Sequence, residues 1–448
     1  MERSRGELWI AARVRVLRAP PTFEAISTAI MELSEIDLTD LNLFVHGDPH
    51  LAWKTLREKA PIYWHERKPC HGFWAITRYN DAQTVYRDPM RFSSANGIVL
   101  NASLAHESAD TMNSVGGESL RAAPSRRSLI ATDPPRHREV REIINRRFTP
   151  HAISAAEHRV RGIVAEVLDD MILLRECDLV SDVAAKIPSA TICEMIGVPR
   201  EDWPLMFRLA SMAGAPDEPE HRAGSSPLET MRRTRRESFE YFTRLLDERR
   251  KSPRDDLASI LADACYDRAV ITELEALSNC FLLLGAGQET TRNSISGSVL
   301  AMTQHPEQFA MLRSTPLMIS TAVEELIRWI SPVTHVMRTC TEASMLGGVQ
   351  IRAGDKVVIW NASVNRDEDI FADADRLDLA RTPNHHLAFG YGEHFCLGAH
   401  LARLELRVFL EELLARNLNL ELTGPIERAA SNLAAGIKRM PMRVAIQT

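Results

Sequence analysis

The longest regular hydrophobic pattern in the chain begins after Thr272-Glu273-Leu274-Glu275 and continues at helical spacing to Gln304. A threonine followed three residues later by a glutamate predicts a capping box at the start of a helix, and His305-Pro306 predicts its end. At 1.5 Å per residue this helix would be roughly 48 Å long. A helix of that length crosses a whole domain, so we expect it to form the axis of the core.

Shorter stretches with the same helical spacing account for much of the remaining chain. We predict helices at residues 51–60, 81–86, 133–141, 152–171, 187–196 and 228–250. Strand patterns are short, and we predict them at residues 61–64, 72–77 and 333–338, with a β-hairpin at residues 347–360. Asp133 is expected to cap the helix that follows it. These patterns predict more helices than strands.

Two segments without periodicity interrupt these elements. Residues 93–130 form a long irregular stretch, and residues 213–227 contain three prolines and two glycines between two helical stretches. Loops of such length are uncommon in a compact domain and are usually either functional or disordered. We therefore expect these two segments to be functional or loosely held.

The composition narrows the class of protein. Of the 448 residues, 45% are hydrophobic and 25% are charged, and the net charge of −6 gives no indication of nucleic-acid binding. No apolar run approaches the ~20 residues that a membrane-spanning helix needs. Seven cysteines are scattered without a paired pattern, which indicates a reducing compartment. We expect a monomeric cytoplasmic protein that binds neither nucleic acid nor membrane.

One cysteine stands among glycines and aromatics in Phe389-Gly390-Tyr391-Gly392-Glu393-His394-Phe395-Cys396-Leu397-Gly398, just before an amphipathic helical pattern at residues 401–410. A thiol at a helix N-terminus favours the thiolate, which is the metal-binding form. The glycines remove side chains around the sulfur, as a loop requires when its backbone lies against a flat ligand. A single soft ligand suggests haem iron rather than zinc. The alternative is a buried free cysteine, which is the commoner fate of a lone Cys.

This stretch resembles the haem-binding loop of the cytochrome P450 superfamily through the pattern Phe-x-x-Gly-x-His-x-Cys-x-Gly. The resemblance runs from about Ile36 to the C-terminus and is nearest to bacterial members that act on terpenoids and steroids. It implies a mainly α fold with a small β region, as a single haem domain over residues 31–448, with residues 1–30 as a poorly ordered N-terminal extension. It also implies haem b as the cofactor, with Cys396 as the iron ligand and further cofactor contacts from Ala286, Phe389 and Gly398.

The middle of the long helix carries Ala286-Gly287-Gln288-Glu289-Thr290-Thr291 in place of the expected apolar packing. Small residues let a ligand approach the backbone, and a threonine hydroxyl can bond to the carbonyl four residues earlier and form a local groove. A helix kink is the alternative for this pattern alone. Together with the Cys396 loop, it resembles the oxygen-activation motif of cytochrome P450 enzymes. The resemblance implies catalytic roles for Thr290 at the oxygen site and for Glu289 in proton relay.

His137 and Arg141 are four residues apart, so they project from one face of a predicted helix. Two donors on one face suit a pair of carboxylates, whereas a solvated basic face is the alternative. The P450 resemblance implies that these side chains contact a haem propionate. It implies the same role for Arg338 and His394.

Glu325 and Arg328 stand three apart just before Ser331-Pro332. On its own, this spacing indicates a surface ion pair worth ~0.5 kcal/mol or less. The resemblance implies instead a buried pair that is joined by Arg381 and braces the cysteine loop.

The resemblance also implies a substrate pocket and separate redox partners. The residues expected beside the pocket are Val333, Thr334, Val336, Ala434 and Ala435, whereas His335 has no role that the sequence explains. Because the chain has no flavin, nicotinamide or ferredoxin-like motif, we expect electrons from a separate ferredoxin and ferredoxin reductase. The basic docking surface expected for an acidic ferredoxin consists of Arg136, Arg138, Arg146, Arg147, Arg403 and Arg407.

The function predicted from these features is that of a haem-thiolate monooxygenase. Such an enzyme would insert one atom of dioxygen into a hydrophobic small molecule, for example a terpenoid or a steroid. One alternative is a peroxide-driven peroxygenase, which would be expected to lack the acid–alcohol pair Glu289-Thr290. Another is a haem sensor or ligand carrier without turnover.

Overall fold

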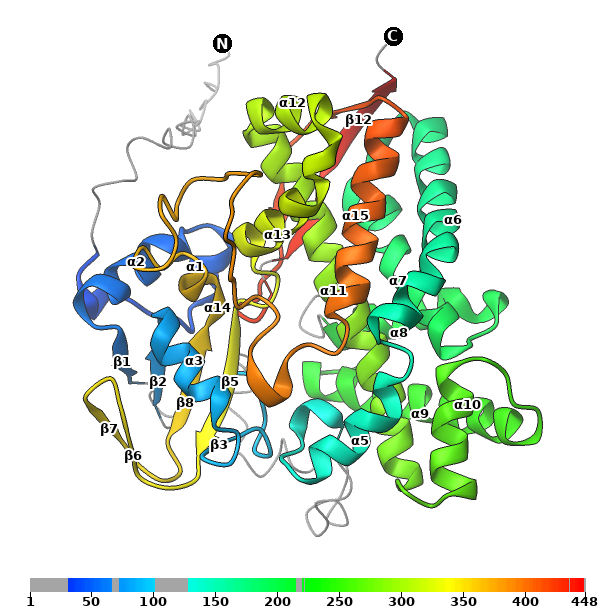
Figure 1. Cartoon of the computed structure of the whole chain (residues 1–448), viewed down its shortest axis with the longest axis horizontal. Helices are drawn as coiled ribbons and strands as arrows, with labels where there is room; N and C mark the ends of the chain where they lie inside the picture. Colours follow the sequence, from blue (N-terminus) through cyan, green and yellow to red (C-terminus); the bar gives the residue numbers. More distant parts are fainter. Residues whose placement is uncertain are drawn as a thin grey trace, which may run out of the picture.

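A computed structural model describes residues 31–66, 72–100, 128–214, 220, 222–434 and 436–446 of the chain (Figure 1). The predictions for residues 1–30, for Ala435 and for most of the irregular stretch at 93–130 lie outside these residues. The α-helices are α1 Leu41–Val45, α2 Pro49–Lys59, α3 Tyr79–Arg87, α5 Arg136–Asn145, α6 Pro150–Leu174, α7 Lys186–Ile196, α8 Trp203–Gly214, α9 Pro227–Lys251, α10 Leu257–Ala262, α11 Glu273–Gln304, α12 Pro306–Ser314, α13 Ile319–Ile330, α14 Asn361–Val364 and α15 Ala399–Ala415.

The strands are few and short, so the prediction of a mainly α fold with a small β region is confirmed. They are β1 Ile62–His65, β2 Phe73–Ile76, β3 Phe92–Ser93, β4 Glu176–Asp178, β5 His335–Cys340, β6 Ser344–Leu346, β7 Val349–Ile351, β8 Lys356–Trp360, β9 Leu418–Leu422, β10 Glu427–Arg428, β11 Ile437–Arg439 and β12 Pro441–Ile446. The largest sheet has the order β1-β2-β8-β5-β3, in which only β2 and β8 run parallel.

Helix α11 begins and ends where the sequence predicts. The Thr272 hydroxyl accepts a hydrogen bond from the Glu275 backbone, and the Glu275 carboxylate accepts one from the Thr272 backbone, so the capping box is confirmed. The helix packs against α7, α8, α9, α13 and α15, and it is therefore the axis of the helical core. None of the described helices is both long and apolar enough to cross a membrane.

The strand region and the helical region lie side by side, and the segment that precedes α15 runs between them (Figure 1). In the strand region, Trp53 of α2 and Trp360 of β8 are almost fully buried, with ring centroids 5.7 Å apart. Phe44 of α1 stacks on Trp360 at 6.2 Å. These rings fix α1 and α2 to the sheet that carries β5 and β8, and they bury a large apolar area.

Two local predictions are wrong. Residues 347–360 do not form one hairpin, because β7 pairs with β6 while β8 joins the large sheet. Gly347 and Gly348 have positive φ angles of 51° and 81°, which suit a tight turn between β6 and β7. Asp133 does not cap α5, because its carboxylate accepts hydrogen bonds from the Ser93 hydroxyl and the Ser94 N–H instead. These two hydrogen bonds connect the end of β3 to the start of α5.

Candidate functional site

The cysteine loop is closed by its own backbone. The Cys396 N–H donates to the Phe389 carbonyl at 2.9 Å, and α15 begins at Ala399 with Gly398 as its N-cap residue. Burial raises the pKa of the Cys396 thiol, while the Gly398 N–H and the guanidinium groups of Arg141 and Arg403 act in the opposite direction. The sulfur therefore lies at a helix start between two positive charges, as a thiolate ligand requires.

The glycines of this loop are explained in part by the loop's own conformation. Gly390 and Gly392 both have φ angles of +70°, which side chains rarely adopt. A Cβ atom on Gly392 would lie 2.8 Å from the Tyr86 carbonyl oxygen. The expectation that every glycine clears space for a flat ligand is therefore wrong for Gly392, which instead lets the loop pack against α3. Gly398 has open space where a Cβ would be.

Four basic side chains predicted to bind propionates come together from three segments. The rings of His137 and His394 lie with centroids 4.2 Å apart. Burial, together with the charges of Arg338, His137 and Arg141, lowers the pKa of His394 to about 3. Burial, followed by the charge of Arg141, lowers the pKa of His137 to about 4. These groups form one cluster, in which Arg141 and Arg338 carry the positive charge and the low pKa values of the two histidines favour neutral rings.

This cluster fits a dianionic ligand such as the two propionates of haem. Both ring nitrogens of His137 are buried without a hydrogen-bond partner among the described residues. The buried Arg338 guanidinium donates to the Met337 carbonyl, and no described carboxylate lies within ion-pair distance of it. Buried polar and charged groups are normally paired, so unpartnered donors of this kind indicate a ligand. The thiol and the cluster together are the protein groups that a thiolate-bound haem b needs.

The middle of α11 has its polar groups arranged along the helix. Ala286 is exposed although it lies at the centre of this long helix, and the Thr290 hydroxyl donates to the Ala286 carbonyl at 3.0 Å. The helix nevertheless continues without interruption. The Glu289 carboxylate accepts hydrogen bonds from Arg292 and, at 3.5 Å, from Asn293. A Cβ atom on Gly214 would lie 2.8 Å from Glu289 Oε2, so the end of α8 closely approaches this carboxylate.

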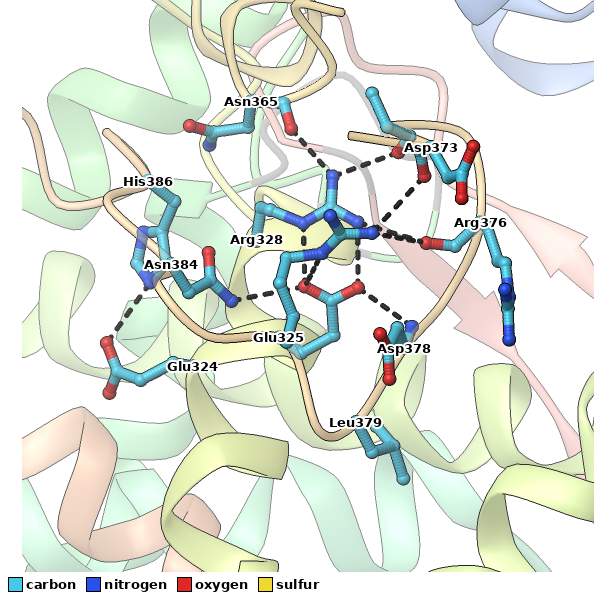
Figure 2. A network of polar contacts seen from close by, with 12 residues as sticks. Glu324, Glu325, Arg328, Asn365, Asp373, Arg376, Asp378, Leu379, Asn384 and His386 are labelled. Atoms are coloured by element: carbon cyan, nitrogen blue, oxygen red, sulfur yellow. Dashed lines mark hydrogen bonds and ion pairs between the residues drawn. The ribbon is translucent and has the colours of Figure 1, made fainter. Parts of the chain in front are cut away.

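Glu325 and Arg328 of α13 are fully buried and form a two-point ion pair (Figure 2). Arg328 Nε and Nη2 donate to the Glu325 carboxylate at 2.7 and 2.8 Å, and its Nη1 donates to the carbonyls of Asn365 and Ala374. Arg381 Nε donates to Glu325 Oε2 at 3.1 Å. The structure thus brings together the three residues that the resemblance assigned to one triad.

The same network reaches the cysteine loop through side chains that the sequence did not single out. The Asn384 amide donates to Glu325 (Figure 2). The Leu387 N–H donates to the Asn365 side chain at 2.7 Å. Glu324, next along α13, is bound by Arg403 of α15. Burial raises the pKa of Glu324, but hydrogen bonds from Arg403 and His386 outweigh it and lower this pKa to about 2.

On the side of β5, the predicted pocket residues fall into two groups. Val333 forms a β-bridge with Ala434. Val336 and Arg338 are two residues apart in β5, so their side chains lie on the same face of that strand. Thr334 is buried, and its hydroxyl donates to the Asn432 carbonyl. The Thr334 hydroxyl is therefore already hydrogen-bonded to the backbone. The side chains of Val333, Val336 and Ala434 are entirely apolar.

His335 has a structural explanation. Its Nδ1 lies 2.8 Å from the Asn432 carbonyl, and its Nε2 accepts the Leu100 N–H at 2.9 Å. Nδ1 must therefore carry the proton. Burial lowers the pKa of His335 to about 4, which agrees with a neutral ring. The ring ties together β5, the segment before residue 101 and the segment before Ala434.

Glu405 of α15 was missed by sequence reasoning. It is almost fully buried, at 1% exposure, and its Oε1 has no hydrogen-bond partner among the described residues. Burial raises the pKa of Glu405 to about 8, although the hydroxyls of Thr191 in α7 and Thr291 in α11 act in the opposite direction. The only sequence signal is a glutamate between two leucines in an amphipathic helix. At neutral pH this carboxyl is mostly protonated.

The predicted docking surface is mixed in charge rather than basic. Arg146 is exposed and has no ion-pair partner among the described residues. The other five arginines are paired: Arg136 with Glu275, Arg138 with Glu393, Arg147 with Asp255, Arg403 with Glu324 and Arg407 with Glu157. The sequence could not predict these pairs because nearly all of the carboxylates come from distant segments.

Comparison with known proteins gives one family. The family model for cytochrome P450 matches residues 316–431. Cytochrome P450 126 of Mycobacterium tuberculosis is 37% identical over 426 residues, which cover 92% of this chain and 98% of that protein. Linalool 8-monooxygenase of Pseudomonas putida is 36% identical, covering 90% and 97%.

A solved structure agrees with this assignment over the same length. The cytochrome P450 of Mycobacterium marinum in complex with pseudoionone superposes with a TM-score of 0.81 at 32% identity. The match covers 92% of this chain and 99% of that one. With the cysteine loop and the basic cluster beside it, these matches show that the chain belongs to the cytochrome P450 family of haem b monooxygenases.

Proposed function

We propose that this enzyme oxidises a hydrophobic small molecule of the terpenoid class, using electrons from a separate ferredoxin and ferredoxin reductase. The observation that carries this proposal is the arrangement of Cys396 at the start of α15 beside a cluster of two histidines and two arginines, in which the buried Arg338 has no described carboxylate within ion-pair distance and the buried His137 has no described hydrogen-bond partner, although its Nδ1 lies 4.0 Å from Glu393. A steroid of similar size is a second possible substrate within the same hydrophobic class.

The residues that would hold haem are those already brought together around the cysteine loop. Cys396 would bind the iron, and His137, Arg141, Arg338 and His394 would bind the propionates. When bound, haem supplies the dioxygen chemistry, and a thiolate ligand favours O–O cleavage. Ala286, Phe389 and Gly398 would make the remaining cofactor contacts. The role of the Glu325, Arg328 and Arg381 network would be to hold the loop that presents the thiolate.

Protons would reach the reaction through Glu289 and Thr290. Arg292 orients the Glu289 carboxylate, which can bind and release a proton at its oxygens. The Thr290 hydroxyl is held by the Ala286 carbonyl, so its oxygen remains able to accept a hydrogen bond. A positioned acid and alcohol are expected in an enzyme that uses dioxygen and are not needed by one that uses peroxide. Their presence favours the monooxygenase over the peroxygenase.

The terpenoid class is supported by two relatives and by the predicted pocket. One relative is a linalool 8-monooxygenase, and the solved Mycobacterium marinum structure contains pseudoionone. Val333, Val336 and Ala434 are small or branched apolar side chains, which suit a hydrocarbon better than a polar ligand. The Thr334 hydroxyl is bound to the backbone and would not select a polar substrate.

The redox partner would dock on a surface on which five of the six arginines are already paired. An acidic ferredoxin would compete with carboxylates such as Glu393 for Arg138, so association should depend strongly on salt. The exposed Arg146, which has no ion-pair partner in the described parts of the chain, is the reason to expect an acidic partner despite the mixed charge. A cytoplasmic location and a monomeric state stay predictions from the sequence.

The test is a substrate panel on haem-loaded protein with surrogate ferredoxin, ferredoxin reductase and NADH. Binding is read from the shift of the Soret band, and product is measured by mass spectrometry. We expect linear terpenoids to shift the band and to give product only with NADH and dioxygen. Product with hydrogen peroxide alone would favour a peroxygenase, and band shifts without any product would favour a carrier or sensor.

A further inference from the structure

A second site lies behind α11. A cleft of about 900 Å³ is lined by Gln288 and Arg292, which are four residues apart and share one face of that helix. Ala286 and Thr290 are offset from these residues by two positions, or roughly 200° around the helix. The cleft is therefore on the opposite face of α11 from the candidate haem site. Its remaining walls come from α7, α8, α9 and β11.

The residues that line this cleft include more cations than anions. Its lining includes seven basic residues but only two acidic ones, Asp178 and Glu220. Arg208 and Arg233 both bind Glu237, so one carboxylate serves two guanidinium groups. Such sharing cannot neutralise both partners, and the surplus positive charge favours an anion.

Further cations stand around the mouth of the cleft. Lys438 and Arg439 lie 3.5 and 2.8 Å from Glu220, and Arg439 also lies 3.8 Å from Glu427. Lys186, at the start of α7, lines the cleft and forms no ion pair within the described parts of the chain. Lysine and arginine side chains that converge from separate elements bind phosphate and carboxylate groups readily.

Two buried polar atoms in the cleft lack partners. Ser189 is 1% exposed and Gln288 is 4% exposed, and both line the cleft. No described group forms a hydrogen bond with Ser189 Oγ or with Gln288 Oε1. A buried hydroxyl normally has a partner, and this one can donate to an oxyanion. The lack of partners for these two atoms is independent of the surplus charge. Each of these two observations indicates a bound polar ligand.

We propose that the cleft behind α11 binds a small oxyanion carrying phosphate or carboxylate groups. Lys186, Arg233 and Arg292 supply the charge, and Ser189 supplies a hydroxyl donor. Because Arg292 also binds Glu289, a bound oxyanion competes with that carboxylate for the same guanidinium. This competition links the cleft to proton delivery, a consequence that rests on the proposed function, whereas the binding itself does not.

The binding is tested by calorimetry on haem-loaded, substrate-free protein at constant ionic strength. Inorganic pyrophosphate and citrate are the two probes, which separate a preference for phosphate from one for carboxylate. We expect saturable binding of at least one probe at a single site. The double variant Lys186→Gln/Arg233→Gln should bind at least roughly tenfold more weakly, because two charge-assisted contacts are lost.

A matched control removes the same charge elsewhere. Arg236 and Lys251 are exposed on α9 and do not line the cleft, so Arg236→Gln/Lys251→Gln should bind like the wild type. If the first double variant fails to fold, Lys186→Gln alone replaces it, since its removal strands no described carboxylate. No saturable binding to the wild type, or equal weakening in the control, would overturn the proposal. Binding is measured without turnover, so a failure here leaves the proposed function untouched.

Discussion

The two sides of the candidate haem site differ in how their charges are balanced. On the cysteine side, the fully buried Glu325 accepts hydrogen bonds from three side chains, and its main partner Arg328 is also fully buried. Behind α11, basic groups outnumber carboxylates, and the buried atoms Ser189 Oγ and Gln288 Oε1 have no described partner. On the cysteine side, the buried charged groups bind one another, whereas behind α11 two buried polar atoms have no described hydrogen-bond partner.

The difference shows what each side is suited to do. A buried ion pair with every partner in place resists movement, because losing one partner leaves a charge in a low-dielectric interior. That is suitable for a loop that must hold a thiolate in one position. Polar atoms without a described partner, such as Ser189 Oγ and Gln288 Oε1, can exchange ligands without such a penalty. That is suitable for the movement of protons and anions.

The largest expected effect is that of Cys396→Ser on the cysteine side. A serine hydroxyl ionises far less readily than a thiol at a helix start, so the variant should lose the thiolate ligand. We expect complete loss of the carbon monoxide difference band typical of a thiolate-bound haem, while the fold is retained. The spectrum of the reduced, CO-treated protein checks this. A variant that keeps the band would show that another residue binds the iron.

Glu325→Ala should be the most destabilising change in the paired network. It strands Arg328 and Arg381, and removing one partner of a buried pair costs about 3–5 kcal/mol. We expect little haem-loaded protein and a markedly lower midpoint of chemical unfolding. Glu166→Ala is the control, because Glu166 and Arg200 form an exposed pair, for which ~0–1 kcal/mol is expected. Equal effects of the two changes would contradict the proposed bracing role.

Glu405 lies between the two sides and gives a prediction about pH. Its folded pKa of about 8 exceeds the ordinary value of 4.5, so the folded state binds more protons than the unfolded state between these values. The free energy of unfolding should therefore fall as pH rises from about 4.5 to 8. Glu405→Gln removes this dependence, and its stability advantage should grow by roughly 4 kcal/mol over that range. Denaturant unfolding at several pH values measures it, and a pH-independent difference would contradict the buried, protonated carboxyl.

Local signals made most of the helical fold predictable from the sequence. The capping box at Thr272 and the glycine after Ile196 set helix ends within a few residues. The pairing of β7 with β6, by contrast, depends on which strands meet in space. The Asp133 carboxylate likewise accepts hydrogen bonds from Ser93 and Ser94, which are about 40 residues away in sequence. Local spacing cannot distinguish such partners from the nearer ones.

The candidate site was predictable where its residues stand in one motif. Cys396 and His394 share a loop, and Thr290 and Glu289 share one helical turn. Glu405 was not predictable, because its burial results from three helices that meet around it. Contacts between separate elements also create the cleft behind α11. The sequence shows the chemistry of each side chain, but only the packing shows which side chains remain without a partner.

Thr290→Ala should have the smallest effect on the structure and a selective effect on the reaction. Among the described residues, the Thr290 hydroxyl bonds only to the Ala286 carbonyl of its own helix, and alanine is the better helix former, so stability should change little. Positioned proton donors contribute a factor of about 10²–10⁴ to the rate. The rate of product formation should therefore fall by a factor near the lower end of that range, about 10². NADH should still be consumed and hydrogen peroxide should accumulate.

The matched control for this variant is Thr303→Ala on the same helix. Thr303 also bonds to a backbone carbonyl, that of Leu300, but it lies 13 residues further along α11, near its end. Its product per NADH should equal that of the wild type. Glu289→Gln should differ from Thr290→Ala by slowing NADH consumption itself, because it removes the acid rather than the alcohol. If Thr290→Ala forms as much product per NADH as Thr303→Ala, with a true substrate bound, then the Thr290 hydroxyl takes no part in proton delivery and the two sides of the site differ in structure alone.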